Sequence, residues 1–169
     1  MLPLAQLKAE LKIDYVDDDF VLAGLRDAAV ALIERRTQSR LYPFTDTARL
    51  SAWEPTVLPM APVQSVESIT YTASGSTVTM PSADYYLDQT DAMPVLRFIE
   101  EPEMDEHTSA LVTYRTGYDA IPAPLERCIV ALVGAWYNNP EASQPIALQT
   151  VPLSVEFILD WYTTGSRIR

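Results

Sequence analysis

The spacing of hydrophobic residues changes twice along the chain, and this change is what most constrains the fold. Apolar residues recur every three or four positions over residues 4–36, as in amphipathic helices. From residue 41 to residue 116, β-branched and aromatic residues alternate with polar ones, as in strands. Helical spacing returns at Pro124. This order predicts an α+β fold: a helical bundle built from N- and C-terminal helices, with an inserted antiparallel β-region.

The helical parts predict specific buried faces. A break at residues 13–16 divides the first part into two helices, and Asp17, Asp18 and Asp19 are expected to cap the second one. We expect the stripes of the two long helices to bury each other, through Leu22, Leu25, Ala29, Leu32, Leu125, Ile129, Leu132 and Trp136.

The middle of the chain predicts several short strands. The clearest runs over residues 63–72 and is followed by a hairpin turn at Ser74–Ser76. Further strands are expected at residues 77–80, 85–88, 95–99 and 111–115, with another at 49–53. The acidic run from Glu100 to His107 contains a proline and is expected to be a solvated loop.

We expect a single domain over residues 1–169, with four segments. Residues 1–40 are helical, 41–116 form the β-region, 117–150 are helical, and 151–169 form a C-terminal docking segment. The last segment contains a short helix that starts at Pro152 and is expected to be capped by Gly165. A helix of about three turns does not persist alone in water, so it must dock on its own core or on a partner.

Composition excludes several classes of site. The net charge is −11, which disfavours wrapping of duplex DNA through phosphate contacts. Cys128 is the single cysteine and His107 the single histidine, so disulfides, cysteine zinc sites and multi-histidine metal sites are excluded. No G-x-S-x-G motif, glycine-rich phosphate loop or apolar run of membrane-spanning length is present. We therefore predict no catalytic residues, no cofactor, no metal and no membrane contact.

Two acidic clusters and two aromatic pairs are candidates for a functional role. The aspartates at 14 and 17–19 lack the alternation and central glycine of a calcium loop, so helix capping explains them better. The Glu100–His107 run leaves open an acidic hydrolase or sugar-binding domain. Trp136–Tyr137 and Trp161–Tyr162 place large aromatics at helix ends, where some faces are expected to remain exposed.

The order of four motifs resembles the head–tail connector (adaptor) proteins of tailed phages, which also occur in phage-derived gene transfer particles. The resemblance covers nearly the whole chain. Its motifs are Leu7–Asp14 with Asp17–Asp19 and the helix to Thr37; Pro62–Val66 with Ile69 and Tyr71; Tyr114–Tyr118 with Ile121, Pro122, Leu125, Leu132, Trp136 and Tyr137; and Pro152–Tyr162. The chain departs from the family pattern at Asn138–Glu141, where a basic residue is expected before the glutamate.

The resemblance implies a structural protein rather than an enzyme. Such proteins form a ring of about twelve copies beneath the portal protein ring, extend the DNA channel, and join the capsid to a downstream neck or tail protein. DNA passes through the channel without tight or specific binding. The resemblance further implies that the protein is made in the bacterial host cytoplasm and resides in the virion neck.

The C-terminal segment is the expected portal-docking element. Aromatic and arginine side chains dominate many interfaces, and the docking residues expected here are Leu153, Phe157, Trp161, Tyr162, Arg167 and Arg169. Three alternatives stay open: another neck or tail-completion protein, the acidic hydrolase or sugar-binding domain, and a partner-binding module unrelated to virions.

Overall fold

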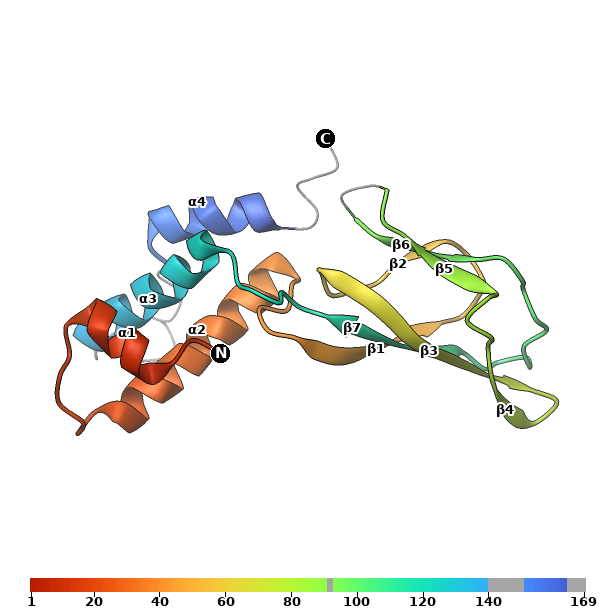
Figure 1. Ribbon diagram of the computed structural model, residues 1–169, viewed down its shortest axis with the longest axis horizontal. Helices are drawn as coiled ribbons and strands as arrows, with labels where there is room; N and C mark the ends of the chain where they lie inside the picture. Colours follow the sequence, from red (N-terminus) through yellow and green to blue (C-terminus); the bar gives the residue numbers. More distant parts are fainter. Residues whose placement is uncertain (91–92, 140–150, 164–169) are drawn as a thin grey trace. The chain divides into compact units, whose positions relative to one another are not determined.

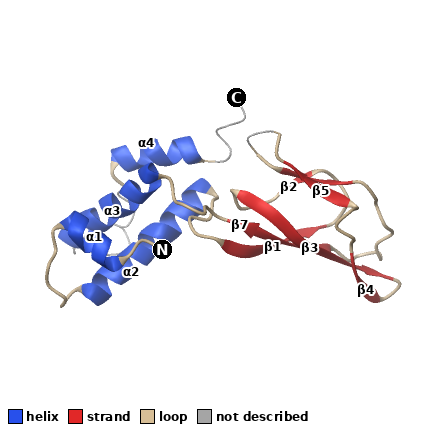
Figure 2. Ribbon diagram, viewed as in Figure 1, coloured by secondary structure: helices blue, strands red, loops and turns tan. Residues whose placement is uncertain are grey.

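The computed structural model describes residues 1–90, 93–139 and 151–163. The chain divides into two compact units, which we call the helical unit (Met1–Leu41 with Ala120–Arg169) and the β-unit (Tyr42–Asp119). Helices lie in the first unit and strands in the second (Figure 2). The predicted mixed α+β class is therefore confirmed. No helix among the described residues is long and apolar enough to cross a membrane.

The helical unit contains α1 (Leu4–Leu11), α2 (Asp19–Thr37), α3 (Ala123–Asn138) and α4 (Leu153–Tyr162) (Figure 1). Helix α3 contacts all three others, and α2 also contacts α1 and α4. Helices from the two ends of the chain therefore share one core, because each has an apolar face that needs a partner.

Helix α3 buries the face that the sequence predicts. Its buried side chains are Leu125, Cys128, Ile129, Leu132, Val133 and Trp136. A glycine in this helix allows α1 to approach: a Cβ at Gly134 would lie 3.0 Å from Leu11 Cδ2. The spacing of apolar residues in α3 therefore determines which face of the helix is buried, and Gly134 leaves room for the close contact with α1.

The predicted face of α2 was only partly right. Its buried residues are Leu22, Ala29, Val30, Ile33 and Thr37, whereas Leu25 and Leu32 are half-buried. The helix is turned so that Arg26 lies partly covered, with its guanidinium donating to the Leu2 carbonyl oxygen at 3.2 Å. The aliphatic stem of an arginine can line a core while its charged end reaches a polar partner. A prediction based on the spacing of leucines therefore does not place Arg26 on the covered face.

The prediction that aspartate side chains cap the N-terminus of α2 was wrong. Asp18 occupies the N-cap position, but its side chain makes no capping hydrogen bond. Its carboxylate instead accepts a hydrogen bond from the Tyr137 hydroxyl at 2.6 Å, and Asp19 pairs with Lys8 at 2.5 Å. The carboxylates therefore join α2 to α3 and α1 rather than capping their own helix.

The β-unit consists of two antiparallel sheets. One has the strand order β1-β7-β3-β4 and the other β2-β6-β5. The strands are β1 (Phe44–Leu50), β2 (Thr56–Val57), β3 (Val63–Ala73), β4 (Ser76–Thr79), β5 (Tyr85–Asp88), β6 (Val95–Phe98) and β7 (Ala110–Thr116).

The first strand differs from its prediction. The expected strand at 49–53 begins earlier, at Phe44, and ends at Leu50, because Phe44–Leu50 pair residue by residue with Thr116–Ala110 of β7. The two-residue strand β2 was not predicted, since it is too short to show alternation.

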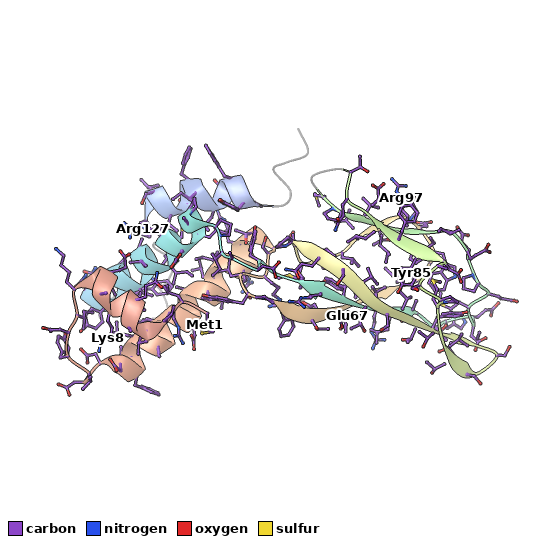
Figure 3. All side chains as sticks on the ribbon, viewed as in Figure 1. Met1, Lys8, Glu67, Tyr85, Arg97 and Arg127 are labelled. Atoms are coloured by element: carbon purple, nitrogen blue, oxygen red, sulfur yellow. The ribbon has the colours of Figure 1, made fainter. Side chains whose placement is uncertain are left out.

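The expected hairpin turn joins β3 and β4. Ala73 pairs with Ser76, so Ser74 and Gly75 form a two-residue turn, both with positive φ (51° and 75°). Apolar residues from both sheets form the core of the unit, with Trp53 packed edge-on against Tyr71 and Phe98 at ring-centroid distances of 5.4 and 5.2 Å. Tyr85 lies in this core and Arg97 pairs with Asp88 at its margin (Figure 3).

Candidate partner-binding site

Helix α4 is apolar on two opposite sides. Val155 and Leu159 are 2% and 1% exposed and face α3 and α2. On the other side, Leu153, Phe157 and Trp161 are 83%, 64% and 68% exposed. An ordinary surface helix is polar on the side that faces water. The exposed side, which we call the outer face of α4, therefore needs an explanation beyond the fold of the helical unit.

The outer face is a continuous stripe. Its three residues are spaced by four, so they lie one above another along the helix. The Phe157 and Trp161 rings are 5.5 Å apart at their centroids and tilted by 52°. Such a pre-arranged aromatic pair loses little side-chain freedom on binding and buries a large area.

The residues of the outer face were predicted from the sequence, whereas those of the buried inner face, Val155 and Leu159, were not. Val155 and Leu159 anchor the helix, and spacing by four also relates them. The missed signal was that α4 carries two apolar stripes, of which the one with the smaller side chains is buried. Tyr162 is half-buried beside the inner face. Arg167, Arg169 and the expected cap Gly165 lie outside the described residues.

A pocket lies between α2 and α4 within the helical unit. Its volume is about 600 Å³, and its lining includes Ala31, Leu32, Arg35, Arg36 and Leu159. Arg36 forms an exposed ion pair with Asp160 at 3.5 Å, a kind of contact that contributes little stability in water. We call this the basic pocket.

The loop between α1 and α2, together with the first turn of α2, carries a second exposed patch. Phe20 is 90% exposed, Val16 70% and Tyr15 47%. The Tyr137 hydroxyl lies 2.5 Å from that of Tyr15 and donates to Asp18, which raises the pKa of Tyr137. These contacts tie the loop to the end of α3. This patch was not predicted from the sequence, because Val16 and Phe20 stand among aspartates whose pattern indicated only a helix cap.

The aromatic pairs at the ends of α3 and α4 behave differently. Trp136 is 3% exposed, which confirms its predicted place among the buried residues of α3, and its neighbour Tyr137 is half-buried. The position of Trp136 on the apolar stripe of α3, four residues after Leu132, turns it into the core. Trp161 is exposed, as expected.

The acidic run between β6 and β7 stabilises a turn. The Asp105 carboxylate accepts hydrogen bonds from the backbone N–H groups of Ser74 and Gly75, both at 2.8 Å. Glu101, Glu103, Glu106 and His107 are exposed. Catalytic carboxylate pairs are typically held in partly buried sites, and these side chains are exposed.

The remaining candidate groups offer little chemistry. Burial raises the pKa of the Cys128 thiol to about 11, so the nucleophilic thiolate is scarce near neutral pH. Within residues 1–90, 93–139 and 151–163, no three histidine, cysteine, aspartate or glutamate side chains gather as a metal site would require. Arg127, labelled in Figure 3, forms an exposed ion pair with Glu10, whereas the pairs of Lys8 with Asp19 and of Arg40 with Glu34 are partly buried.

Comparison with known proteins finds the same fold in particle necks. The chain is similar to a chain in the structure "Neck of empty GTA particle computed with C6 symmetry", with a TM-score of 0.80 and 23% identity over 96% of this chain and 89% of that one. It is also similar to chains in "Virion of native gene transfer agent (GTA) particle" (TM-score 0.79, 22% identity, 96% and 89%) and "Neck of native GTA particle computed with C12 symmetry" (0.75, 22%, 96% and 88%). No protein-family model and no curated protein sequence matches the chain. The shared feature is the fold over almost the whole of both chains.

Proposed function

We propose that this chain is a structural head–tail adaptor in the neck of a tailed phage or phage-like particle. In this role it forms a ring of about twelve copies beneath the portal, extends the DNA channel and joins the capsid to the next neck or tail protein. The observation that carries the proposal is the fold match over 96% of the chain to chains of gene transfer agent necks. The order of motifs in the sequence supports the same assignment independently.

The charge of the chain suits a channel through which DNA slides. Each copy carries −11, so a dozen copies carry about −132 before screening. A ring of this sign repels phosphates and does not hold the DNA.

The outer face of α4 is proposed as the portal-docking element. Leu153, Phe157 and Trp161 supply the anchors, Tyr162 flanks them, and Arg167 and Arg169 steer the segment toward an acidic surface. In this proposal the four helices act as one bundle, and the single domain presents α4 to the portal while the inner face of α4 remains on its own core.

Replacement of the outer-face aromatics tests this docking. A Phe157→Ser/Trp161→Ser chain should fold normally and lose at least about a hundredfold in affinity for the portal ring, because central aromatic anchors carry most of an interface's energy. The exposed Ser154 on the same helix offers a matched control, Ser154→Ala, which should bind as the unaltered chain does. The measurement is co-sedimentation of the chain with purified portal rings, and unchanged binding of the double variant would refute the docking assignment.

The alternative hypothesis, an acidic hydrolase with its site in the Glu100–His107 run, has a separate test. Glu101→Gln and His107→Ala remove the exposed groups of the acidic run. We expect both variants to join particles at the unaltered level, because the proposed role requires no acid–base chemistry. A particle that assembles normally but loses a measurable glycosidase activity on either replacement would favour the enzyme.

A further inference from the structure

We propose that the α1–α2 loop of one copy docks into the basic pocket of the next copy, giving a head-to-tail contact between identical chains. This contact rests on the proposed ring and specifies which surfaces close it. A ring requires two different faces on each subunit, because a heterologous contact repeats around an axis. The helical unit carries two such faces at opposite ends of α2.

The first face is the loop patch, defined here as Asp14, Val16, Asp17 and Phe20. All four residues are exposed, and Phe20 at 90% is the most exposed large hydrophobic side chain among the described residues. Asp14 and Asp17 make no ion pair within the described part of the chain, unlike Asp19, which pairs with Lys8. Lys12 is the sole cation of this loop. The patch is therefore an apolar projection with a net negative charge.

The second face is the basic pocket. Ala31, Leu32 and Leu159 give it apolar walls, and Arg35 and Arg36 place positive charge at its rim. Arg36 is engaged by Asp160, whereas the Arg35 side chain has no hydrogen-bond or ion-pair partner among residues 1–90, 93–139 and 151–163. Glu156 also lines the pocket, so its charge is mixed, with the arginines in excess.

The two faces complement each other in apolar character and charge. Phenylalanine and valine side chains suit the apolar walls of the pocket. The carboxylates of Asp14 and Asp17 and the guanidinium of Arg35 are opposite in charge, and none of them has an ion-pair partner in the part of the chain that the structure describes. The helix dipole explains Asp19 in the first turn of α2 and the arginines in its last turn. It does not explain why Val16 and Phe20 point into solvent, and a partner surface does.

The two faces cannot meet within one chain. Helix α2 has 19 residues, and its ends are about 27 Å apart at 1.5 Å per residue. Contact therefore requires a second copy. Because each copy presents both faces, the assembly can continue beyond a dimer.

Complementation between two variants tests the contact in the full-length chain. Phe20→Ser/Asp17→Arg removes the loop patch, and Arg35→Glu/Ala31→Glu removes the pocket rim. Each variant alone should self-associate at least about tenfold more weakly than the unaltered chain, because each lacks one half of the contact. Mixed in equal amounts, the two should form dimers and nothing larger, since one intact contact remains. The measurement is sedimentation velocity up to millimolar concentration.

Cysteine cross-linking locates the contact directly. Cys128 is buried, so added thiols react selectively. A chain with Asp17→Cys mixed with a chain with Arg35→Cys should cross-link through a short thiol reagent. A chain with Thr77→Cys, on the exposed strand β4, should not cross-link with either.

The outcomes separate this contact from the proposed function. A chain that stays monomeric, or cross-linking no stronger than the Thr77 control, overturns the contact. An unaltered chain that stops at dimers also overturns it, because the faces then form a two-fold pair. Portal binding through the outer face of α4 survives all these results. Loss of portal docking in the α4 test, with self-association intact, leaves the contact standing.

Discussion

Helices α3 and α4 belong to the same unit and use their surfaces differently. Helix α3 buries one apolar stripe, and its solvent side carries Arg127 and small residues. Helix α4 buries Val155 and Leu159 and exposes Leu153 and the two larger side chains Phe157 and Trp161. The apolar face of α3 is covered by other parts of its own chain, whereas only one of the two apolar faces of α4 is covered in this way. The side chains that a helix leaves in water can therefore be more informative about function than those it buries.

The largest expected effect follows from the core side of α3. Leu132 is completely buried, so Leu132→Ala should cost about 3 kcal/mol of unfolding free energy through lost transfer energy and a residual cavity. Urea unfolding followed by circular dichroism measures this cost. A loss below about 1 kcal/mol would mean that the helical unit can collapse around the cavity and that α3 is not its central helix.

The inner face of α4 should give a smaller and more local effect. Leu159 is also buried, but it borders the basic pocket, so water can reach the space that Leu159→Ala creates. We expect a loss of about 2 kcal/mol and faster amide exchange in α4 while α3 stays protected. Native-state hydrogen exchange reads both helices in one experiment. Equal acceleration in α3 would show that the two helices open as one unit.

The Tyr137 hydroxyl should contribute less than either leucine and in a pH-dependent way. Its hydrogen bond to Asp18 raises its pKa above the ordinary value of 10. The stabilisation is therefore fully present below pH 10 and is lost as the pH rises through the folded-state pKa. The melting temperature of Tyr137→Phe should lie below that of the unaltered chain at pH 7, and the difference should shrink above pH 10. A difference that does not change with pH would contradict this role of the hydroxyl.

The fold was predicted correctly from the sequence where the apolar residues follow a single regular spacing. The face of α3 was predicted correctly because all of its buried positions are apolar. The face of α2 was predicted incorrectly in part because Arg26 occupies a covered position and Val30 lay outside the leucine stripe. Local spacing does not reveal a long-range partner, which is also why the bond between Asp18 and Tyr137 was missed.

The apolar residues of α4 could be predicted from the sequence, but which of its two stripes faces solvent could not. Leu153, Phe157 and Trp161 stood out by size and spacing, but Val155 and Leu159 have the same spacing. Which stripe faces inward depends on the shape of the surface that α2 and α3 offer. That surface forms only when α2 and α3, which the whole β-unit separates in the chain, pack together.

The smallest expected effect on stability belongs to the outer face of α4. Trp161 is 68% exposed, so Trp161→Ser should change the unfolding free energy by less than about 0.5 kcal/mol despite the loss of the largest side chain in the helix. The contact with the Phe157 ring disappears, but both rings already face water. Thermal unfolding of Trp161→Ser beside Leu159→Ala, two residues away, measures the contrast within one helix. A loss of several kcal/mol in the tryptophan variant would mean that this ring is packed in the free chain, and the outer face could then not serve as a binding surface without first opening.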